Sequence, residues 1–285
     1  MQTFNYDEAF SRNIGWLTRR EQGILRRSRA AIAGLGGVGG VHLLTLCRLG
    51  IGRFHVADFD AFDLANFNRQ AGATVETLGQ PKLDVMIRQA QAINPEVEIT
   101  GFPQGVTADN LNSFLGGVSI FIDGLDFFAL NARRQAFAAC AAKGIPAVTA
   151  APLGMGAAVL NFLPGGMSFE DYFQLGDGSE GEQAVRFLMG LAPARLQMGY
   201  LADPSAVDLG RRKGPSTIMA CQLCAGAAAT ETLKILLGRG PVRAAPKGYH
   251  FDAYRNRFAR TWRPGGNRNP LQRVLIALAK RKLGI

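Results

Sequence analysis

A glycine cluster directly after a short apolar run is the feature that most constrains this fold. Residues 29–33 (RAAIA) are followed by Gly34-Leu35-Gly36-Gly37-Val38-Gly39-Gly40 and then by an apolar helical pattern. A second strand-like run, residues 54–57, ends at Asp58. A strand, a glycine turn, a helix, a second strand and an acid within about 30 residues form the βαβ unit that holds a nucleotide phosphate at a helix N-terminus.

The alternation of strands and helices continues to residue 163. Apolar runs predict strands at 97–102, 118–122, 145–151 and 158–163, and helical patterns lie at 81–94 and 127–143. Strands that alternate with helices are typical of a doubly wound sheet whose strands are mostly parallel. We therefore expect a Rossmann-like α/β fold with a crossover loop and a basic C-terminal helical arm.

Composition divides the chain into five expected segments. Residues 164–216 are rich in Gly and Pro, and residues 165–182 contain five acids and no Lys or Arg, which predicts a flexible crossover loop over the substrate. A long helical pattern then runs from Thr217 to Leu237. The segments are an N-terminal helical arm (1–28), a nucleotide-binding core (29–163), the crossover loop (164–216), a closing helix with a last strand (217–262) and a basic arm (263–285).

The net charge of +10 is concentrated at one end of the chain. Residues 1–238 contain 20 Lys+Arg and 21 Asp+Glu, a sum of −1, whereas residues 239–285 contain 12 Lys+Arg and only Asp252, a sum of +11. A basic field over the whole body would indicate nucleic acid, but this distribution does not, and we expect no nucleic-acid partner. Residues 270–283 predict an amphipathic helix that either docks on the body or meets an acidic partner or an anionic membrane surface.

Cysteine content and the N-terminal sequence favour a reduced, cytoplasmic protein. Four cysteines in 285 residues do not form a disulfide scaffold. No apolar run reaches the roughly 18 residues of a membrane span, and the first ten residues lack the layout of a signal peptide.

Acidic residues follow two of the predicted strands at the edge where ligands bind in an open α/β sheet. Asp58 and Asp60 follow the second strand, and Asp123 and Asp126 follow the fourth. Each of them alone could be only a helix cap. Together with the glycine turn, they predict a nucleotide site.

Two cations help to distinguish which kind of nucleotide the site binds. The glycine turn and Asp58 alone would fit an oxidoreductase that binds NAD(P) or FAD. However, Asn66-Phe67-Asn68-Arg69-Gln70 places a guanidinium beside this acid, and Lys82 begins a helix against the preference of the helix dipole. Hydride transfer needs neither cation, whereas a triphosphate under cleavage needs both, together with a metal, because charge accumulates on its oxygens. Asp126 is suited to hold Mg²⁺ beside such phosphates.

The order of these motifs resembles the adenylation domain of the ThiF/MoeB/HesA family, the prokaryotic relatives of ubiquitin-activating enzymes. The matching segments lie within residues 10–165, and the helix after Cys221 resembles the closing helix of the family. They are GLGGVGG, HVADFD, NFNRQ, GQPK, INP, IDGLD and the strand before Ala151-Pro152. The resemblance implies adenylation of a carboxylate with ATP and Mg²⁺, at the C-terminus of a small ubiquitin-like or sulfur-carrier-like protein or of a peptide. A non-catalytic binding module with the same fold is the remaining alternative.

The resemblance also implies roles for single residues. Arg69 and Lys82 would contact the phosphates, Asp126 would hold Mg²⁺, and Arg12 would reach across a homodimer as an arginine finger. The other residues expected to contact the nucleotide are Gly34, Gly36, Gly37, Gly39, Asp58, Asp60, Asn66, Gln70 and Asp123.

The cysteines depart from the pattern of this family. Many members bind zinc with two CxxC pairs, but this chain has one pair, Cys221 and Cys224, and tetrahedral zinc needs four ligands. Residues 152–216, where relatives carry a nucleophilic cysteine, contain none, and Cys47 and Cys140 lie on apolar faces. We therefore expect neither zinc nor a catalytic cysteine, so that the acyl-adenylate passes to another protein or to a small nucleophile.

Overall fold

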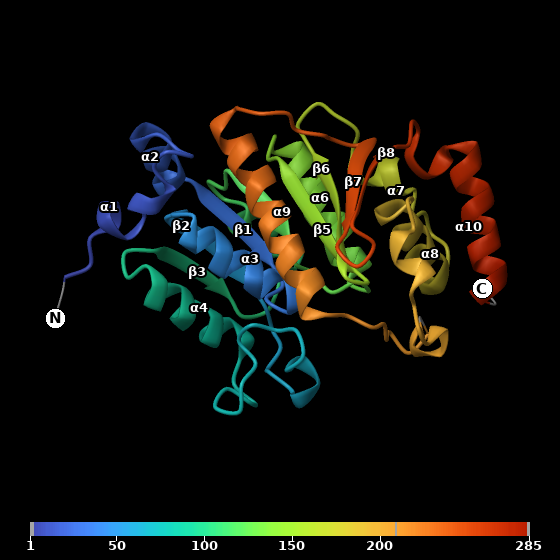
Figure 1. The fold of residues 1–285 in the computed structure, drawn as a ribbon, viewed down its shortest axis with the longest axis horizontal. Helices are drawn as coiled ribbons and strands as arrows, with labels where there is room; N and C mark the ends of the chain where they lie inside the picture. The colour runs from blue at the N-terminus through green and yellow to red at the C-terminus, as the bar shows by residue number, and fades with distance from the viewer. Residues whose placement is uncertain (1–2, 209, 284–285) are drawn as a thin grey trace.

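Eight strands form one continuous sheet in the computed structural model, which describes residues 3–208 and 210–283 (Figure 1). Their order across the sheet is β3-β2-β1-β4-β5-β6-β7-β8. The strands are β1 (Arg29–Ala33), β2 (Arg53–Ala57), β3 (Glu98–Phe102), β4 (Ile120–Asp123), β5 (Ala147–Leu153), β6 (Gly156–Phe162), β7 (Lys247–Asp252) and β8 (Arg257–Trp262).

The sheet is parallel from β3 to β5 and antiparallel from β5 to β8. The chain passes from β1 outward to β2 and β3, and then returns to place β4 on the other side of β1. This reversal puts a switch point between β1 and β4, where open α/β sheets bind their ligands. The doubly wound, mostly parallel fold predicted from the sequence is thus confirmed.

Helices cover both faces of the sheet. They are α1 (Tyr6–Ala9), α2 (Arg19–Arg27), α3 (Gly37–Arg48), α4 (Lys82–Ile93), α5 (Leu111–Phe114), α6 (Leu130–Ala142), α7 (Phe169–Phe173), α8 (Glu180–Leu191), α9 (Ile218–Leu237) and α10 (Pro270–Leu283). Helices α3 and α9 lie side by side across one face, where Leu43 and Cys224 share a buried cluster with Ile32 of β1 (Figure 1). The other face is buried by α6, α7 and α8 in a second, aromatic cluster.

The expected crossover loop is not irregular throughout, because residues 164–216 contain both α7 and α8. Phe173 and Phe187 are buried in the second cluster, and their rings lie 4.9 Å apart. A capping box between Ser179 and Glu182 starts α8, and this local signal outweighs the surrounding glycines. The expected single last strand is a hairpin, β7 and β8.

Helix α10 docks on α8. The side chain of Gln272 donates to the carbonyl of Met189 at 2.6 Å, and Ile276 is buried against Val185. Lys280 forms an ion pair with Glu182. Within the part of the chain that the structure describes, no helix combines the length and the apolar character needed to cross a membrane.

Candidate functional site

The glycine turn after β1 brings three backbone segments into direct contact. Gly34 has a φ of 84°, and a Cβ at this position would lie 2.3 Å from the carbonyl oxygen of Gly124, in the loop after β4. A Cβ on Gly39 would lie 1.8 Å from the carbonyl oxygen of Gly34. Only glycine fits at both positions. Helix α3 begins directly after this turn. Its N-cap residue, Gly36, has no side chain that could accept hydrogen bonds from the N–H groups of the first turn. These N–H groups are therefore available to an anion.

Asp58 links the glycine turn to the loop after β2. Its Oδ2 accepts a hydrogen bond from Leu35 N at 2.6 Å, and its Oδ1 accepts one from Asp60 N at 2.8 Å. Burial raises the pKa of this carboxyl, although both hydrogen bonds and the charge of Lys82 oppose the shift. The carboxylate therefore lies at the switch point in a partly desolvated position.

Lys82, at the start of α4, is almost fully buried and its Nζ contacts Asp60 Oδ2 at 3.0 Å. This ion pair offsets the unfavourable position of a cation at a helix N-terminus. Asp60 N donates to Asp58 Oδ1, so Lys82 lies close enough for its charge to lower the pKa of Asp58. Asp60 remains about half exposed.

Arg69 and Gln70 lie against the start of α3. A Cβ on Gly37 would lie 3.5 Å from Cγ of Arg69, and a Cβ on Gly36 would lie 3.6 Å from Nε2 of Gln70. Gln70 is 7% exposed, and its buried Oε1 has no hydrogen-bond partner in the described chain. A buried, unpartnered amide beside an uncapped helix start is suited to contact a polar ligand.

Asn66 has a local structural contact. Its Oδ1 accepts a hydrogen bond from Asp63 N at 3.0 Å, which closes a capping box around the short helical turn Leu64–Asn66. This contact shapes the loop that carries Arg69.

The two acids at the carboxyl end of β4, Asp123 in its last position and Asp126 in the following loop, differ in environment. Asp123 is buried, and its carboxylate accepts hydrogen bonds from Arg133 Nε at 2.8 Å, Thr149 Oγ1 at 2.9 Å and Leu125 N at 3.2 Å. Asp126 is exposed, and the one hydrogen bond assigned to its carboxylate comes from Phe128 N at 2.9 Å. Asp126 is therefore the acid whose oxygen atoms are available to a cation. The described residues hold no group of three or more metal-ligating side chains, and Mg²⁺ beside phosphates commonly uses only one or two carboxylates.

Arg12 lies far from the glycine turn of its own chain. It is exposed in the helical turn Ser11–Asn13, and the neighbouring Asn13 donates to the carbonyl of Leu49, just after α3 ends. The glycine turn lies at the other end of α3. The twelve residues of this helix rise by about 18 Å.

All four cysteines are buried free thiols. Burial raises the pKa of Cys47 to about 11 and that of Cys140 to about 12, so neither is a reactive thiolate. No local pattern indicates that Cys221 lies beside the start of α3, where a Cβ on Gly37 would be 3.2 Å from its Sγ.

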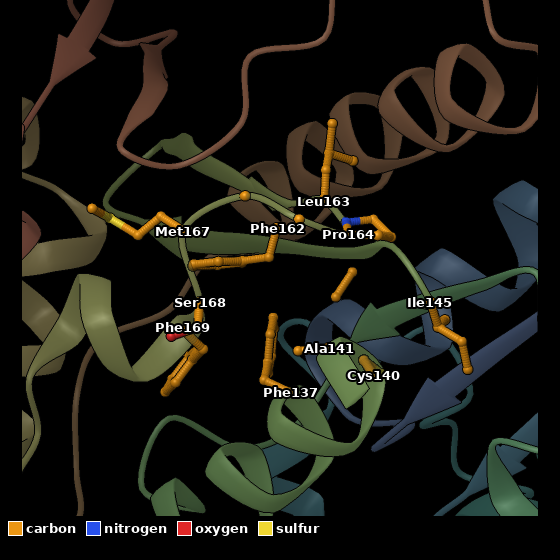
Figure 2. Close-up of a pocket in the computed structure, with 13 residues that line it drawn as sticks. Phe137, Cys140, Ala141, Ile145, Phe162, Leu163, Pro164, Met167, Ser168 and Phe169 are labelled. Carbon is orange, nitrogen blue, oxygen red and sulfur yellow. The ribbon is translucent and has the colours of Figure 1, made fainter. Parts of the chain in front are cut away.

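An apolar hollow lies at the opposite edge of the sheet from the glycine turn, because its lining includes the residues just before β5 whereas the glycine turn follows β1. It is bordered by Ile145, just before β5, and by Leu163, just after β6. The rings of Phe137 and Phe169 also line it (Figure 2). Its volume of about 50 Å³ is far below the roughly 300 Å³ of a typical ligand pocket, and none of its lining side chains is charged. This hollow is not a nucleotide site.

A model of the ThiF family matches residues 10–274. The chain belongs to the ThiF family. One relative is the tRNA threonylcarbamoyladenosine dehydratase of Bacillus subtilis (strain 168), 36% identical over 118 residues, which are 41% of this chain and 46% of the relative. Another is the sulfur carrier protein ThiS adenylyltransferase of Escherichia coli (strain K12), 31% identical over 137 residues, which are 48% of this chain and 54% of the relative. The matches span about half the length of each relative.

Solved structures support the same ThiF-type fold. PaaA has a TM-score of 0.68 at 19% identity, with 92% of this chain and 74% of PaaA covered. E. coli MccB solved with ATP has a TM-score of 0.61 at 17% identity, with coverage of 85% and 65%. E. coli TcdA, a tRNA N6-threonylcarbamoyladenosine dehydratase, has a TM-score of 0.60 at 21% identity, with coverage of 81% and 95%. At these identities the likeness concerns the fold alone.

Proposed function

We propose that this ThiF-family chain adenylates a carboxylate with ATP, forming an acyl-AMP and releasing pyrophosphate. The observation that carries the proposal is that three groups suited to bind phosphate lie at one edge of the sheet: the uncapped start of α3, Arg69 and Lys82. Relatives named as adenylyltransferases for ThiS and for molybdopterin synthase support this reaction class. An NAD(P)- or FAD-dependent oxidoreductase cleaves no triphosphate, so its chemistry would not need these two cations.

The chemistry needs no covalent bond to the protein. Asp58 would accept hydrogen bonds from the ribose hydroxyls, and the backbone N–H groups of α3 with Arg69 and Gln70 would hold the phosphates. The substrate carboxylate attacks the α-phosphorus in line, a C–O–P bond forms, and the bond to the pyrophosphate oxygen breaks. Mg²⁺, when bound by Asp126 and phosphate oxygens, would neutralise the charge that accumulates on the leaving group.

Arg12 favours a homodimer. Arg12 lies about one helix length from the glycine turn of its own chain. It can therefore stabilise the negative charge of the phosphates only in the site of a partner subunit. In a two-fold dimer each protomer would supply this guanidinium to the other. An arginine supplied in this way adds stabilisation to the charge on the transferring phosphoryl group.

The substrate that we propose is the C-terminal carboxylate of a small sulfur-carrier-like or ubiquitin-like protein, or of a peptide. Relatives named for the sulfur carrier ThiS support a protein substrate, and the solved complexes of MccB with MccA support a peptide. We place the reaction in the cytoplasm, in keeping with four free, buried thiols.

Exchange of labelled pyrophosphate into ATP, measured with candidate carboxylates, tests this function. Arg69→Ala and Asp126→Ala should each lower exchange at least about 100-fold, because each removes a charge that stabilises the transition state. Lys143, just after α6, and Glu96, just before β3, are exposed at the opposite edge of the sheet, so Lys143→Ala and Glu96→Ala are matched controls that should retain exchange.

Other outcomes would point to other functions. Retained exchange in both site variants would remove the site assignment. Hydride transfer from a nicotinamide cofactor would establish the oxidoreductase instead, and ATP binding without turnover would indicate a non-catalytic module.

A further inference from the structure

Arg133 of α6 is a buried cation that the adenylation chemistry does not use. It is 2% exposed, and its Nε donates to Asp123 Oδ2 at 2.8 Å. Its Nη2 donates to the carbonyl oxygens of Leu125 at 2.8 Å and of Asp126 at 3.1 Å. Its Nη1 also donates to the carbonyl oxygen of Phe127 at 3.4 Å. One guanidinium therefore holds the carboxylate at the end of β4 and three backbone carbonyls of the loop that follows.

These contacts fix the backbone on which the Asp126 carboxylate stands. The carbonyl of Asp126 is bound by Arg133, while its carboxylate is exposed and accepts a hydrogen bond from Phe128 N at 2.9 Å. An ion pair with Asp123 alone would require the N–H groups along only one edge of the guanidinium. The additional bonds use the planar fork that only arginine provides, and a lysine cannot make them at the same time.

Helix α8 contacts both Arg133 and the loop after β4 through Phe187. The guanidinium carbon of Arg133 lies 4.6 Å from the ring centroid of Phe187, and this ring lies 5.3 Å from that of Phe127, the residue after Asp126. The loop is thus clamped between α6 and α8. Since α8 lies in residues 164–216, a movement in that segment would reach the loop through Phe187.

We propose that Arg133 is a positioning residue that orients Asp126, and that Phe187 couples its position to α8. The proposal rests on the proposed function, in which Asp126 holds the divalent cation. It explains why a fully buried arginine binds loop carbonyls, and it makes the orientation of the metal-binding carboxylate depend on the segment proposed to meet the substrate.

The affinity of the full-length protein for Mn²⁺ in the presence of ATP, measured by electron paramagnetic resonance, tests the proposal without turnover. Arg133→Lys should weaken Mn²⁺ binding about tenfold, and Phe187→Leu about threefold, with metal-free ATP affinity within twofold of wild type. Because both changes act through one contact, the double variant should lose less than the product of the two effects. Amide hydrogen exchange of residues 123–128 in the free protein should be faster in both variants.

Two other residues supply matched controls. Arg134 forms its ion pair with Glu170 of α7 at 2.9 Å, and the buried Phe114 of α5 has its ring 5.2 Å from that of Phe102. Arg134→Lys and Phe114→Leu should therefore leave Mn²⁺ affinity unchanged. If Arg133→Lys does not fold, Phe187→Leu, which keeps the ion pair, is the deciding variant.

The outcomes separate this proposal from the proposed function. If Asp126→Ala weakens Mn²⁺ binding and the folded Arg133 and Phe187 variants do not, the positioning proposal is wrong and the metal site stands. If Asp126→Ala itself leaves Mn²⁺ binding unchanged, the metal assignment in the proposed function fails.

Discussion

Asp58 lies at the edge of the sheet where we propose that ATP binds. It accepts backbone hydrogen bonds from both the glycine turn and the loop after β2, so it joins the two segments on either side of the proposed ribose position. A carboxylate has room for further donors after accepting these two bonds. Burial nevertheless makes the ionised form less favourable than in water and raises its pKa above the ordinary 3.8.

This raised pKa predicts proton release when ATP binds. Ribose hydroxyls that donate to Asp58 favour its ionised form, so binding should lower the pKa and expel a proton at a pH near the raised value. ATP affinity should fall as the pH falls through that value. The measurement is titration calorimetry at mildly acid pH in two buffers of different ionisation enthalpy.

The Asp58→Asn variant isolates this proton from those of ATP itself. Wild type should release more protons than the variant, and the variant should bind ATP at least about tenfold more weakly, the loss of about one charge-assisted hydrogen bond. Equal proton release by the two proteins would contradict a contact between Asp58 and the nucleotide.

The contacts of Asp123 and Arg133 could not be predicted from the sequence. The sequence predicted Asp123 as a nucleotide contact, but in the structure its carboxylate is occupied by Arg133 and Thr149. Nothing local to Arg133, in an alanine-rich helix, indicates that it binds a loop eight residues earlier, or that Phe187 lies on it. Such contacts join elements that are distant in sequence, so no periodicity or cap reveals them.

At the scale of elements, the approach of α3 to β1 depends on a glycine inside the helix. A Cβ on Gly39 would overlap the carbonyl oxygen of Gly34, which is backbone and cannot rotate away. Gly39→Ala should therefore lower the free energy of unfolding by about 3 kcal/mol. Urea denaturation measures this change, and the glycine turn would have to move in any variant that folds.

Gly226 in α9 is the matched control. A Cβ there would meet nothing within 4 Å, so Gly226→Ala should raise the free energy of unfolding by about 0.5–1 kcal/mol. If both variants change stability in the same direction, the contact between α3 and the glycine turn is not the reason for glycine at residue 39.

Most elements could be predicted because each carries its own local signal. The apolar run 29–33 became β1 with the same bounds, and the predicted helix 270–283 became α10. Thr217 caps α9 and Gly238, with a φ of 62°, ends it. The missed α8 carried a Ser179–Glu182 capping box, but the surrounding glycines and acids favoured a loop. The burial of its one aromatic residue, Phe187, against Arg133 of α6 is a tertiary effect.

At the scale of the whole molecule, the positive charge lies on folded elements rather than on a separate arm. Arg239 pairs with Glu21 of α2, and Lys280 pairs with Glu182 of α8. The edge strand β8 exposes Arg257 and Arg260 at the end of the sheet away from β3. Charged side chains on an edge strand resist pairing with other chains. The excess positive charge therefore lies on elements other than the glycine turn. The cations close to that turn are single residues, Arg69 and Lys82.

The attachment of α10 limits how its function can be tested. Removal of residues 264–285 would also remove Asn267, whose side chain donates to the carbonyls of Phe173 and Arg186, and Gln272, which binds that of Met189. These bonds hold the ends of α7 and α8, so a deletion would disturb the crossover helices as well as the basic surface. A point substitution separates the two effects.

Ile276→Asn should release α10 while the nucleotide edge stays intact. Ile276 is 6% exposed against α8, so a polar side chain there costs about 3 kcal/mol of docking, whereas Val274 is 56% exposed on the same helix. Limited trypsin digestion should cut the Ile276→Asn variant faster at Arg273 and Arg281, with ATP affinity within twofold of wild type. Val274→Asn should be cut at the wild-type rate, and equal rates for the two variants would mean that the contact with α8 does not hold α10 in place.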